Sequence, residues 1–212
     1  GKDRYCYFDA SMREQEDHRK QIAKDLKQAI ENKEFELHYQ LQIDSNTEEL
    51  YGMEALIRWP SPTRNAIVTP DEFIQVAIES NHIQAIDEWV IKQAAKDLAK
   101  LRNATNKTVP ISINLSSKTI ENPKLPAMLQ QQIEHYHLNP ADMRVEVTET
   151  GLLRNRDKTI EILHTLKENG FSSSIDDFGT GYSSLSYLQK LPVDALKIDK
   201  SVIDGIGSND QD

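Results

Sequence analysis

SSSIDDFGTGYSSL, Ser172 to Leu185, places two adjacent carboxylates, Asp176 and Asp177, between an apolar run typical of a strand and a turn rich in glycine. Glycine lets the backbone bend sharply, so we expect both acids at the carboxyl end of a strand. Folds of the α/β class carry their ligands at such ends. Taken alone, the stretch also fits a solvated loop rich in aspartate and glycine.

Patterns outside this stretch predict alternating strands and helices. Residues 35–42 and 51–59 alternate with a period of two, and the short polar link between them predicts an antiparallel pair, because a parallel crossover needs a dozen or more residues. Further strands are predicted at 109–117, 143–150, 172–177 and 193–201, and helices at about 13–32, from Thr69 onward, 85–102, 125–137, 158–169 and 183–191.

Polar residues near the strand ends decide between an open sheet and a barrel. An open sheet would spread five such strands too widely for one ligand to meet them all, whereas a (β/α) barrel brings its strand ends to one mouth. The sequence therefore predicts an α/β fold of the barrel type, with six strands. The five polar residues are Glu54, Asn114, Glu146, Asp176 and Lys197.

Composition limits the classes of partner and compartment. A net charge of −9 argues against binding to nucleic acid polymers or anionic membranes, which requires a basic surface. The single cysteine, Cys6, excludes an internal disulfide, and no apolar run approaches the roughly 18 residues of a membrane span. Because the N-terminus also lacks the layout of a signal peptide, we expect a cytoplasmic segment, although other domains could tether the parent protein to a membrane.

The oxygen-rich residue set suggests a site for hard cations. Carboxylates and an amide carbonyl suit Mg²⁺ or Mn²⁺ better than zinc or copper, and Asp176 with Asp177 could serve two ions in phosphoryl hydrolysis. Arg58 could then bind a phosphate oxygen and Lys197 could polarise a water. Each residue also has a simpler interpretation: Glu54 could pair with Arg58, Asn114 could tie down a loop, and Lys197 could form an exposed salt bridge.

Six motifs in order resemble one family, the EAL-domain phosphodiesterases that hydrolyse cyclic di-GMP. The motifs are LHYQ, EALIRW, INLS, EVTET, SIDDFGTGYSSL and ALKID, and they cover about Phe35 to Ile203. The resemblance implies a modified TIM (β/α)8 barrel with an antiparallel first strand, two ions of Mg²⁺ or Mn²⁺, and hydrolysis of cyclic di-GMP to linear pGpG.

The resemblance also implies roles for individual residues. Lys197 resembles the residue that orients the attacking water, Asp176 a ligand that bridges the two ions, and Asp177 a ligand of the second ion. Glu149 resembles the glutamate that holds the DDFGTG loop. The remaining implied metal ligands are Glu54, Asn114 and Glu146, and the implied contacts to guanine, ligand backbone and phosphate are Gln40, Leu56 and Arg58.

Some positions depart from the family pattern. Leu41, Ile78 and Asn81 stand where the family usually has proline, glutamate and glycine. The AEGVE motif, which supplies a metal ligand and the presumed general base, is not in this sequence, so two of eight strands are missing. We therefore expect that the chain is part of a longer polypeptide or receives the missing strands from a second chain, and that residues 1–212 alone lack turnover.

The resemblance extends to domain organisation and partners. Residues 1–12 faintly resemble the final strand of a GGDEF domain, residues 13–32 would be a linker helix, and residues 33–212 would be an EAL domain lacking its C-terminal part. A preceding GGDEF domain and a homodimer are both compatible with this arrangement. Besides the enzyme, a receptor that binds cyclic di-GMP without hydrolysing it, and a purely structural role, remain as alternatives.

Overall fold

The computed structural model describes residues 10–180 and 191–205. Residues 1–9 of the GGDEF-like tail and nearly all of the predicted helix at 183–191 lie outside these residues. The chain folds into two compact units. The first contains residues 10–36 and 57–85, the second contains residues 37–56 and 86–205, and each is described by itself.

In the first unit, two helices pack through apolar residues. Ile22, Leu26 and Ala29 lie along one side of α1 and are buried, and α1 contacts α2. The start of α2 also follows its sequence signal, because Pro70 is its first residue and Thr69 precedes it. The elements are α1 (Ala10–Asn32), β3 (Ala66–Val68) and α2 (Pro70–Glu79), with the end of β2 (Leu50–Ser61) and the start of α3 (Ile83–Thr105).

An aromatic cluster forms the core of this unit. The rings of Phe35, Trp59 and Phe73 have centroids 5.8 to 6.0 Å apart, and all three side chains are buried. Strand β3, which pairs antiparallel with the end of β2, was not predicted. Its three residues are too few for a period of two to be recognised.

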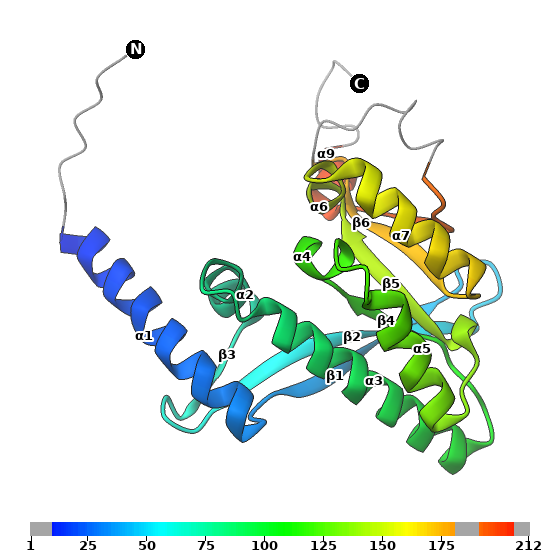
Figure 1. The fold of residues 1–212 in the computed structure, drawn as a ribbon, viewed down its shortest axis with the longest axis horizontal. Helices are drawn as coiled ribbons and strands as arrows, with labels where there is room; N and C mark the ends of the chain where they lie inside the picture. The colour runs from blue at the N-terminus through cyan, green and yellow to red at the C-terminus, as the bar shows by residue number, and fades with distance from the viewer. Residues whose placement is uncertain (1–9, 181–190, 206–212) are drawn as a thin grey trace. The chain divides into compact units, whose positions relative to one another are not determined.

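The second unit contains a mostly parallel sheet with helices alongside it (Figure 1). Among the described residues the strand order is β1-β2-β4-β5-β6-β7, with β3 beside β2, so β1 and β7 are the ends of an unclosed sheet. Strands β2, β4, β5, β6 and β7 pair in parallel, and β1 is joined to its neighbour β2 by a turn at 44–49 too short for a parallel crossover. These strands confirm the predicted α/β fold with an antiparallel first strand. Besides β2, they are β1 (Glu36–Ile43), β4 (Ile111–Asn114), β5 (Met143–Thr148), β6 (Ser172–Phe178) and β7 (Ala195–Ile198).

The core of the second unit lies where the sheet meets its helices. Ile113, Val145 and Ile175 are completely buried, as are Leu129 and Leu163 in two of the helices. Helix α7 contacts both β6 and α5. Besides α3, the helical elements of this unit are α4 (Ser117–Ile120), α5 (Leu125–Tyr136), a 3-10 turn (Pro140–Asp142), α6 (Glu149–Leu153), α7 (Arg156–Glu168) and α9 (Lys200–Gly205).

Two turns have positive φ angles at residues that suit such a conformation. Gly170 follows α7 with φ of +85°, and the next amide, of Phe171, donates to Leu166 O at 3.0 Å, so the predicted helix end is confirmed. Asn81, where the family usually has glycine, has φ of +61°. Asparagine is one of the few residues that tolerates this left-handed conformation, so the departure preserves the turn.

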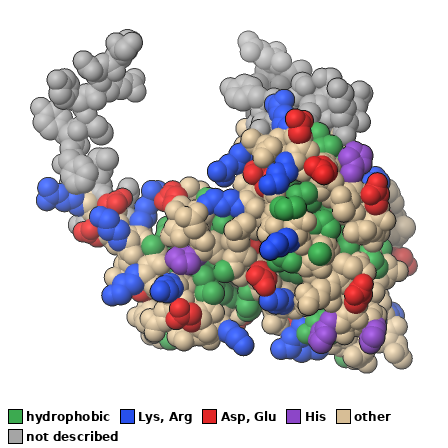
Figure 2. All heavy atoms as spheres, in the orientation of Figure 1, with side chains coloured by type: hydrophobic (Ala, Val, Ile, Leu, Met, Phe, Trp, Pro, Cys, Tyr) green, Lys and Arg blue, Asp and Glu red, His purple; other side chains and the backbone are tan. Residues whose placement is uncertain are grey.

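The surface carries charges of both signs. On the face drawn in Figure 2, acidic and basic side chains are intermixed, and they do not form one large patch of a single sign. None of the helices in the described part of the chain combines the length and the apolar character that crossing a membrane requires.

Candidate functional site

Five of the predicted site residues lie on five neighbouring strands of the second unit. Glu54, Asn114, Glu146, Asp176 and Lys197 come from β2, β4, β5, β6 and β7 in that order. The parallel register places Asn114 beside Glu146, and Thr148, two residues further along β5, beside Asp176. Since side chains two residues apart share a face, Glu146 and Asp176 project from the same side of the sheet. The register thus gathers residues that are far apart in the sequence.

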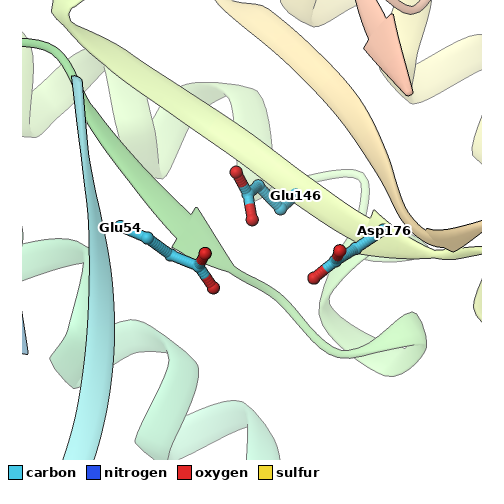
Figure 3. Close-up of side chains that lie close together, drawn as sticks. All are labelled: Glu54, Glu146 and Asp176. Carbon is cyan, nitrogen blue, oxygen red and sulfur yellow. The ribbon is translucent and has the colours of Figure 1, made fainter. Parts of the chain in front are cut away.

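Three carboxylates point toward one another at this place (Figure 3). Glu54, Glu146 and Asp176 each offer an oxygen, and these oxygens lie within 4.8 Å of one another. Glu146 is only 2% exposed, whereas Glu54 and Asp176 are half-buried. Hard oxygen donors at such spacing fit a divalent ion such as Mg²⁺ or Mn²⁺.

The ammonium group of Lys197 contacts all three carboxylates. Its Nζ donates to Glu54 Oε2 at 2.8 Å, to Glu146 Oε2 at 2.5 Å and to Asp176 Oδ2 at 3.3 Å. Burial disfavours the charged ammonium, but hydrogen bonds from Lys197 to Glu146 and Glu54 outweigh this effect and raise the pKa of Lys197. Lys197 is therefore a charged donor at neutral pH. The simpler interpretation of Lys197, as one partner of an exposed salt bridge, does not hold, because its ammonium contacts three acids and is partly buried.

Burial dominates the protonation of Glu146. Desolvation raises the pKa of the Glu146 carboxyl, while the hydrogen bond from Lys197 lowers it and the nearby charge of Glu54 raises it again. A hydrogen bond from Ser112 on the neighbouring strand also favours the charged form. Ser112 is a site contact that the sequence analysis missed, although its place two residues before Asn114 on the same face was a usable signal.

The amide of Asn114 is oriented by Glu54. Asn114 Nδ2 donates to Glu54 Oε1 at 2.8 Å. Because the nitrogen of this amide is used in that way, its carbonyl oxygen is the atom suited to coordinate a cation. The contact links an interior residue of β2 to the last residue of β4, its neighbour in the sheet.

Asp177 differs from the strand residues beside it. Its side chain is exposed and its φ is +54°, and it lies at an irregularity of β6, where the pairing with β7 shifts register between Ile175 and Phe178. Partial desolvation, followed by the charges of Asp176 and Asp199, raises the pKa of Asp177. Asp199 follows β7 directly, and no role was predicted for it from the sequence, although it comes two residues after Lys197.

Glu149 contacts the turn that follows β6. The prediction extended the preceding strand to residue 150, but α6 begins at Glu149, after Thr148 accepts a hydrogen bond from the Gly151 amide at 3.2 Å. Glu149 is 1% exposed, and its Oε2 accepts a hydrogen bond from the Gly179 amide at 2.9 Å. Gly179 has φ of +101°, and a Cβ there would lie 2.6 Å from Val202 Cγ2, so this position requires glycine.

The predicted substrate contacts are described separately because they fall in both units. Gln40 on β1 is exposed and Leu56 on β2 is half-buried. Arg58, further along β2 and in the first unit, is half-buried and donates from NH1 to the carbonyl of Ile57 at 2.8 Å. Roles for these three residues stay predictions.

A polar cavity of about 290 Å³ borders Glu146 and Lys197 on the side of the amino ends of the strands. Arg144 and serines of β6, which precede the acids in their strands, line it, and the Arg144 guanidinium lies 4.1 Å from the centre of the Tyr51 ring. The cavity therefore lies away from Asp177 and the turn after β6.

Two proteins of Pseudomonas aeruginosa are similar to this chain in sequence. A Pseudomonas aeruginosa protein named cyclic di-GMP phosphodiesterase NbdA is 38% identical over 192 residues, which are 91% of this chain and 24% of NbdA. The P. aeruginosa protein named bifunctional diguanylate cyclase/cyclic di-GMP phosphodiesterase MucR is 34% identical over 212 residues, which are 100% of this chain and 31% of MucR. The chain thus spans only a quarter to a third of these relatives.

Solved structures agree with the sequence comparison. The MucR phosphodiesterase in complex with cyclic di-GMP has a TM-score of 0.82 at 34% identity, covering 89% of this chain and 76% of that one. The EAL enzyme Bd1971, in a form that binds cAMP and cyclic di-GMP, has a TM-score of 0.81 at 33% identity, covering 90% and 52%. The sequence model of the EAL domain family matches residues 23–212. Because this match covers most of its length, the chain belongs to the EAL domain family.

Proposed function

We propose that the protein containing this chain hydrolyses cyclic di-GMP to linear pGpG in a metal-dependent reaction. The observation that carries the proposal is the cluster of Glu54, Glu146 and Asp176, three carboxylates from three strands with oxygens within 4.8 Å of one another. The names of NbdA and MucR support the choice of substrate. Membership of the EAL domain family supports it as well.

The donor atoms suit one divalent ion at the cluster and a second beside it. Glu54, Glu146 and Asp176 would hold the first ion together with the Asn114 carbonyl, and Asp177 would hold the second ion, with Asp176 shared between them. When bound, Mg²⁺ or Mn²⁺ would polarise a phosphate oxygen and make a bound water more acidic.

Lys197 would orient the attacking water. Its ammonium is a donor at neutral pH because its pKa is raised, so it cannot take up the proton that the water must lose. The water oxygen forms a bond to phosphorus, the bond to a ribose 3′ oxygen breaks, and that oxygen leaves with a proton. The family motif whose glutamate would be the general base is not in this sequence, so the proposal includes the expectation that residues 1–212 alone lack turnover.

Other residues would place the substrate and the turn after β6. Gln40 would contact guanine, Leu56 the ligand backbone and Arg58 a phosphate. Glu149 would hold the turn through the Gly179 amide, which it contacts at 2.9 Å. A fixed turn would keep Asp177 close to the reacting phosphate.

The test is chromatography of the products after incubation of the full-length protein with cyclic di-GMP and Mg²⁺ or Mn²⁺. We expect pGpG to accumulate, to disappear with a chelator, and to disappear in Glu146→Gln. Glu168→Gln is the matched control, because Glu168 is an exposed carboxylate at the end of α7. Turnover that continues in Glu146→Gln would overturn the proposed site, and binding of cyclic di-GMP without any turnover would favour the receptor alternative.

A further inference from the structure

A buried carboxylate outside the cluster contacts the turn that follows Asn114. Asp87 on α3 is 4% exposed, and no Lys, Arg or His in the described part of the chain forms an ion pair with it. Its Oδ2 accepts two hydrogen bonds from Ser116, from the backbone amide at 3.1 Å and from the hydroxyl at 2.6 Å. A charged group is costly to bury without a cation, and these hydrogen bonds, with a further one from the Thr119 side chain on α4, offset part of that cost.

The residue that Asp87 holds lies directly between the site and α4. Ser116 comes two residues after Asn114, and it is the N-cap of α4, where its hydroxyl oxygen accepts a hydrogen bond from the Thr119 amide at 3.3 Å. The residue between them, Leu115, donates its amide to Glu146 O at 3.0 Å. The turn after β4 is therefore fixed on one side by the strand that carries Glu146 and on the other side by Asp87.

We propose that Asp87 is a positioning residue that fixes the carbonyl of Asn114 for metal binding. Asn114 is the last residue of β4, so its backbone is held between the pairing with Glu146 on one side and the turn that follows on the other. Partners behind a metal ligand commonly change metal affinity by about 10- to 100-fold when they are removed. This inference rests on the proposed function, because it assigns Asn114 to the metal site.

Another aspartate on the same helix provides a comparison. Asp97 also accepts hydrogen bonds from another element, since Tyr39 Oη donates to its Oδ2 at 3.1 Å, and Gln93 on α3 itself donates to the same atom at 2.8 Å. Tyr39 lies on β1, which carries none of the proposed metal ligands. Substituting Asp97 therefore tests the general effect of removing a carboxylate from α3.

The experiment measures Mn²⁺ affinity by calorimetry in the full-length protein, without substrate. We expect Asp87→Asn to weaken Mn²⁺ binding about 10-fold, because a neutral amide oxygen is a weaker acceptor for the two Ser116 donors than a carboxylate oxygen. Asp97→Asn should change the affinity less than about two-fold. Thermal unfolding of each variant shows whether a loss of affinity merely follows a loss of stability.

A milder variant covers the case in which Asp87→Asn does not fold. Ser116→Ala keeps the backbone donor and removes the hydroxyl, so we expect about a threefold loss of Mn²⁺ affinity. Where Asp87→Asn does fold, the double variant Asp87→Asn/Ser116→Ala should bind Mn²⁺ no more weakly than Asp87→Asn alone, because both changes act on one contact. Unchanged affinity in Asp87→Asn, or in Ser116→Ala if the former does not fold, overturns the positioning role. Failure of the wild-type protein to bind Mn²⁺ would overturn the metal site itself.

Discussion

Glu146 and Asp177 are acids of the same site, and the pKa of each is raised, but their surroundings differ. Glu146 lies inside a regular strand, is 2% exposed and contacts Lys197 at 2.5 Å. Asp177 is exposed, stands at a left-handed backbone position, and the acids Asp176 and Asp199 lie near it. The register of the sheet therefore determines the position of Glu146, whereas a local turn determines that of Asp177.

The contrast shows two ways of keeping negative charge in one site. Around Glu146 the protein supplies its own cation and excludes water, so the interactions are strong but the acid is costly to bury. Around Asp177 water screens the charges, so each interaction is weaker. We expect substitutions near Glu146 to affect stability and binding most, and those near Asp177 to affect binding more modestly.

Removing the shared cation should have the largest effect on stability. Lys197→Met roughly keeps the length of the side chain but removes the positive partner of Glu146, Glu54 and Asp176. We expect the free energy of unfolding of the metal-free protein to fall by about 3 kcal/mol, measured by urea denaturation. Lys92→Met, which breaks an exposed pair with Glu88, should change it by less than about 1 kcal/mol. Equal losses of stability in the two variants would show that Lys197 stabilises the fold no more than a lysine in an exposed ion pair does.

Metal affinity should separate the two acids directly. We expect Glu146→Gln to weaken Mn²⁺ binding by roughly 100-fold, because it removes a buried ligand, and Asp177→Asn by roughly 10-fold, because water can replace an exposed one. Calorimetry on the full-length variants measures both. A larger loss in Asp177→Asn than in Glu146→Gln would reverse the comparison.

The turn that carries Asp177 should depend on Glu149. Glu149→Ala removes the acceptor of the Gly179 amide without removing a proposed ligand, so we expect turnover to fall about 10-fold and Mn²⁺ affinity to weaken by less than in Asp177→Asn. Glu149→Gln keeps an acceptor oxygen and should restore part of the turnover. Steady-state kinetics of both variants test this, and unchanged turnover in Glu149→Ala would count against the role of the contact.

The smallest effect concerns pH. A raised carboxyl pKa means that the folded protein binds protons more tightly than the unfolded chain, so the contribution is present at low pH and is lost as pH rises. For Glu146 the loss begins near the ordinary value of 4.5 and continues upward through its raised pKa. Melting temperatures of the metal-free protein should therefore decline less steeply above pH 4.5 in Glu146→Gln than in the wild type. Parallel pH profiles would contradict the assignment.

Much of the fold follows from residue patterns. Alternation of apolar and polar residues predicts the six main strands. Pro70 correctly marks the start of α2 and Gly170 the end of α7, because each residue favours a particular local backbone geometry. The gathering of Asn114, Glu146, Asp176 and Lys197 also follows, since strand ends of a parallel sheet lie at one edge. Glu54 was predicted near a strand end as well, but it lies inside β2 and reaches the cluster because β2 pairs with β4 there.

Other features could not be predicted because they depend on tertiary contacts. Strand β3 exists through its pairing with β2, and α6 begins at Glu149 although the pattern of β5 continues. The hydrogen bonds of Asp87 to Ser116 join residues 29 positions apart, and nothing in the pattern of α3 distinguishes Asp87 from an exposed helical acid. The contacts of Lys197 with three acids likewise require the sheet to be formed.

The position of Lys197 near the end of the sheet has a consequence for the order of folding. Its contact with Glu54 spans 143 residues of sequence, and those with Glu146 and Asp176 span 51 and 21. Contacts of long sequence separation form late because closing the intervening loop costs entropy. During synthesis, the ribosome must release β7 before the acids of the earlier strands acquire their counterion. We therefore expect the contacts of Lys197 to be among the last to form in the described sheet.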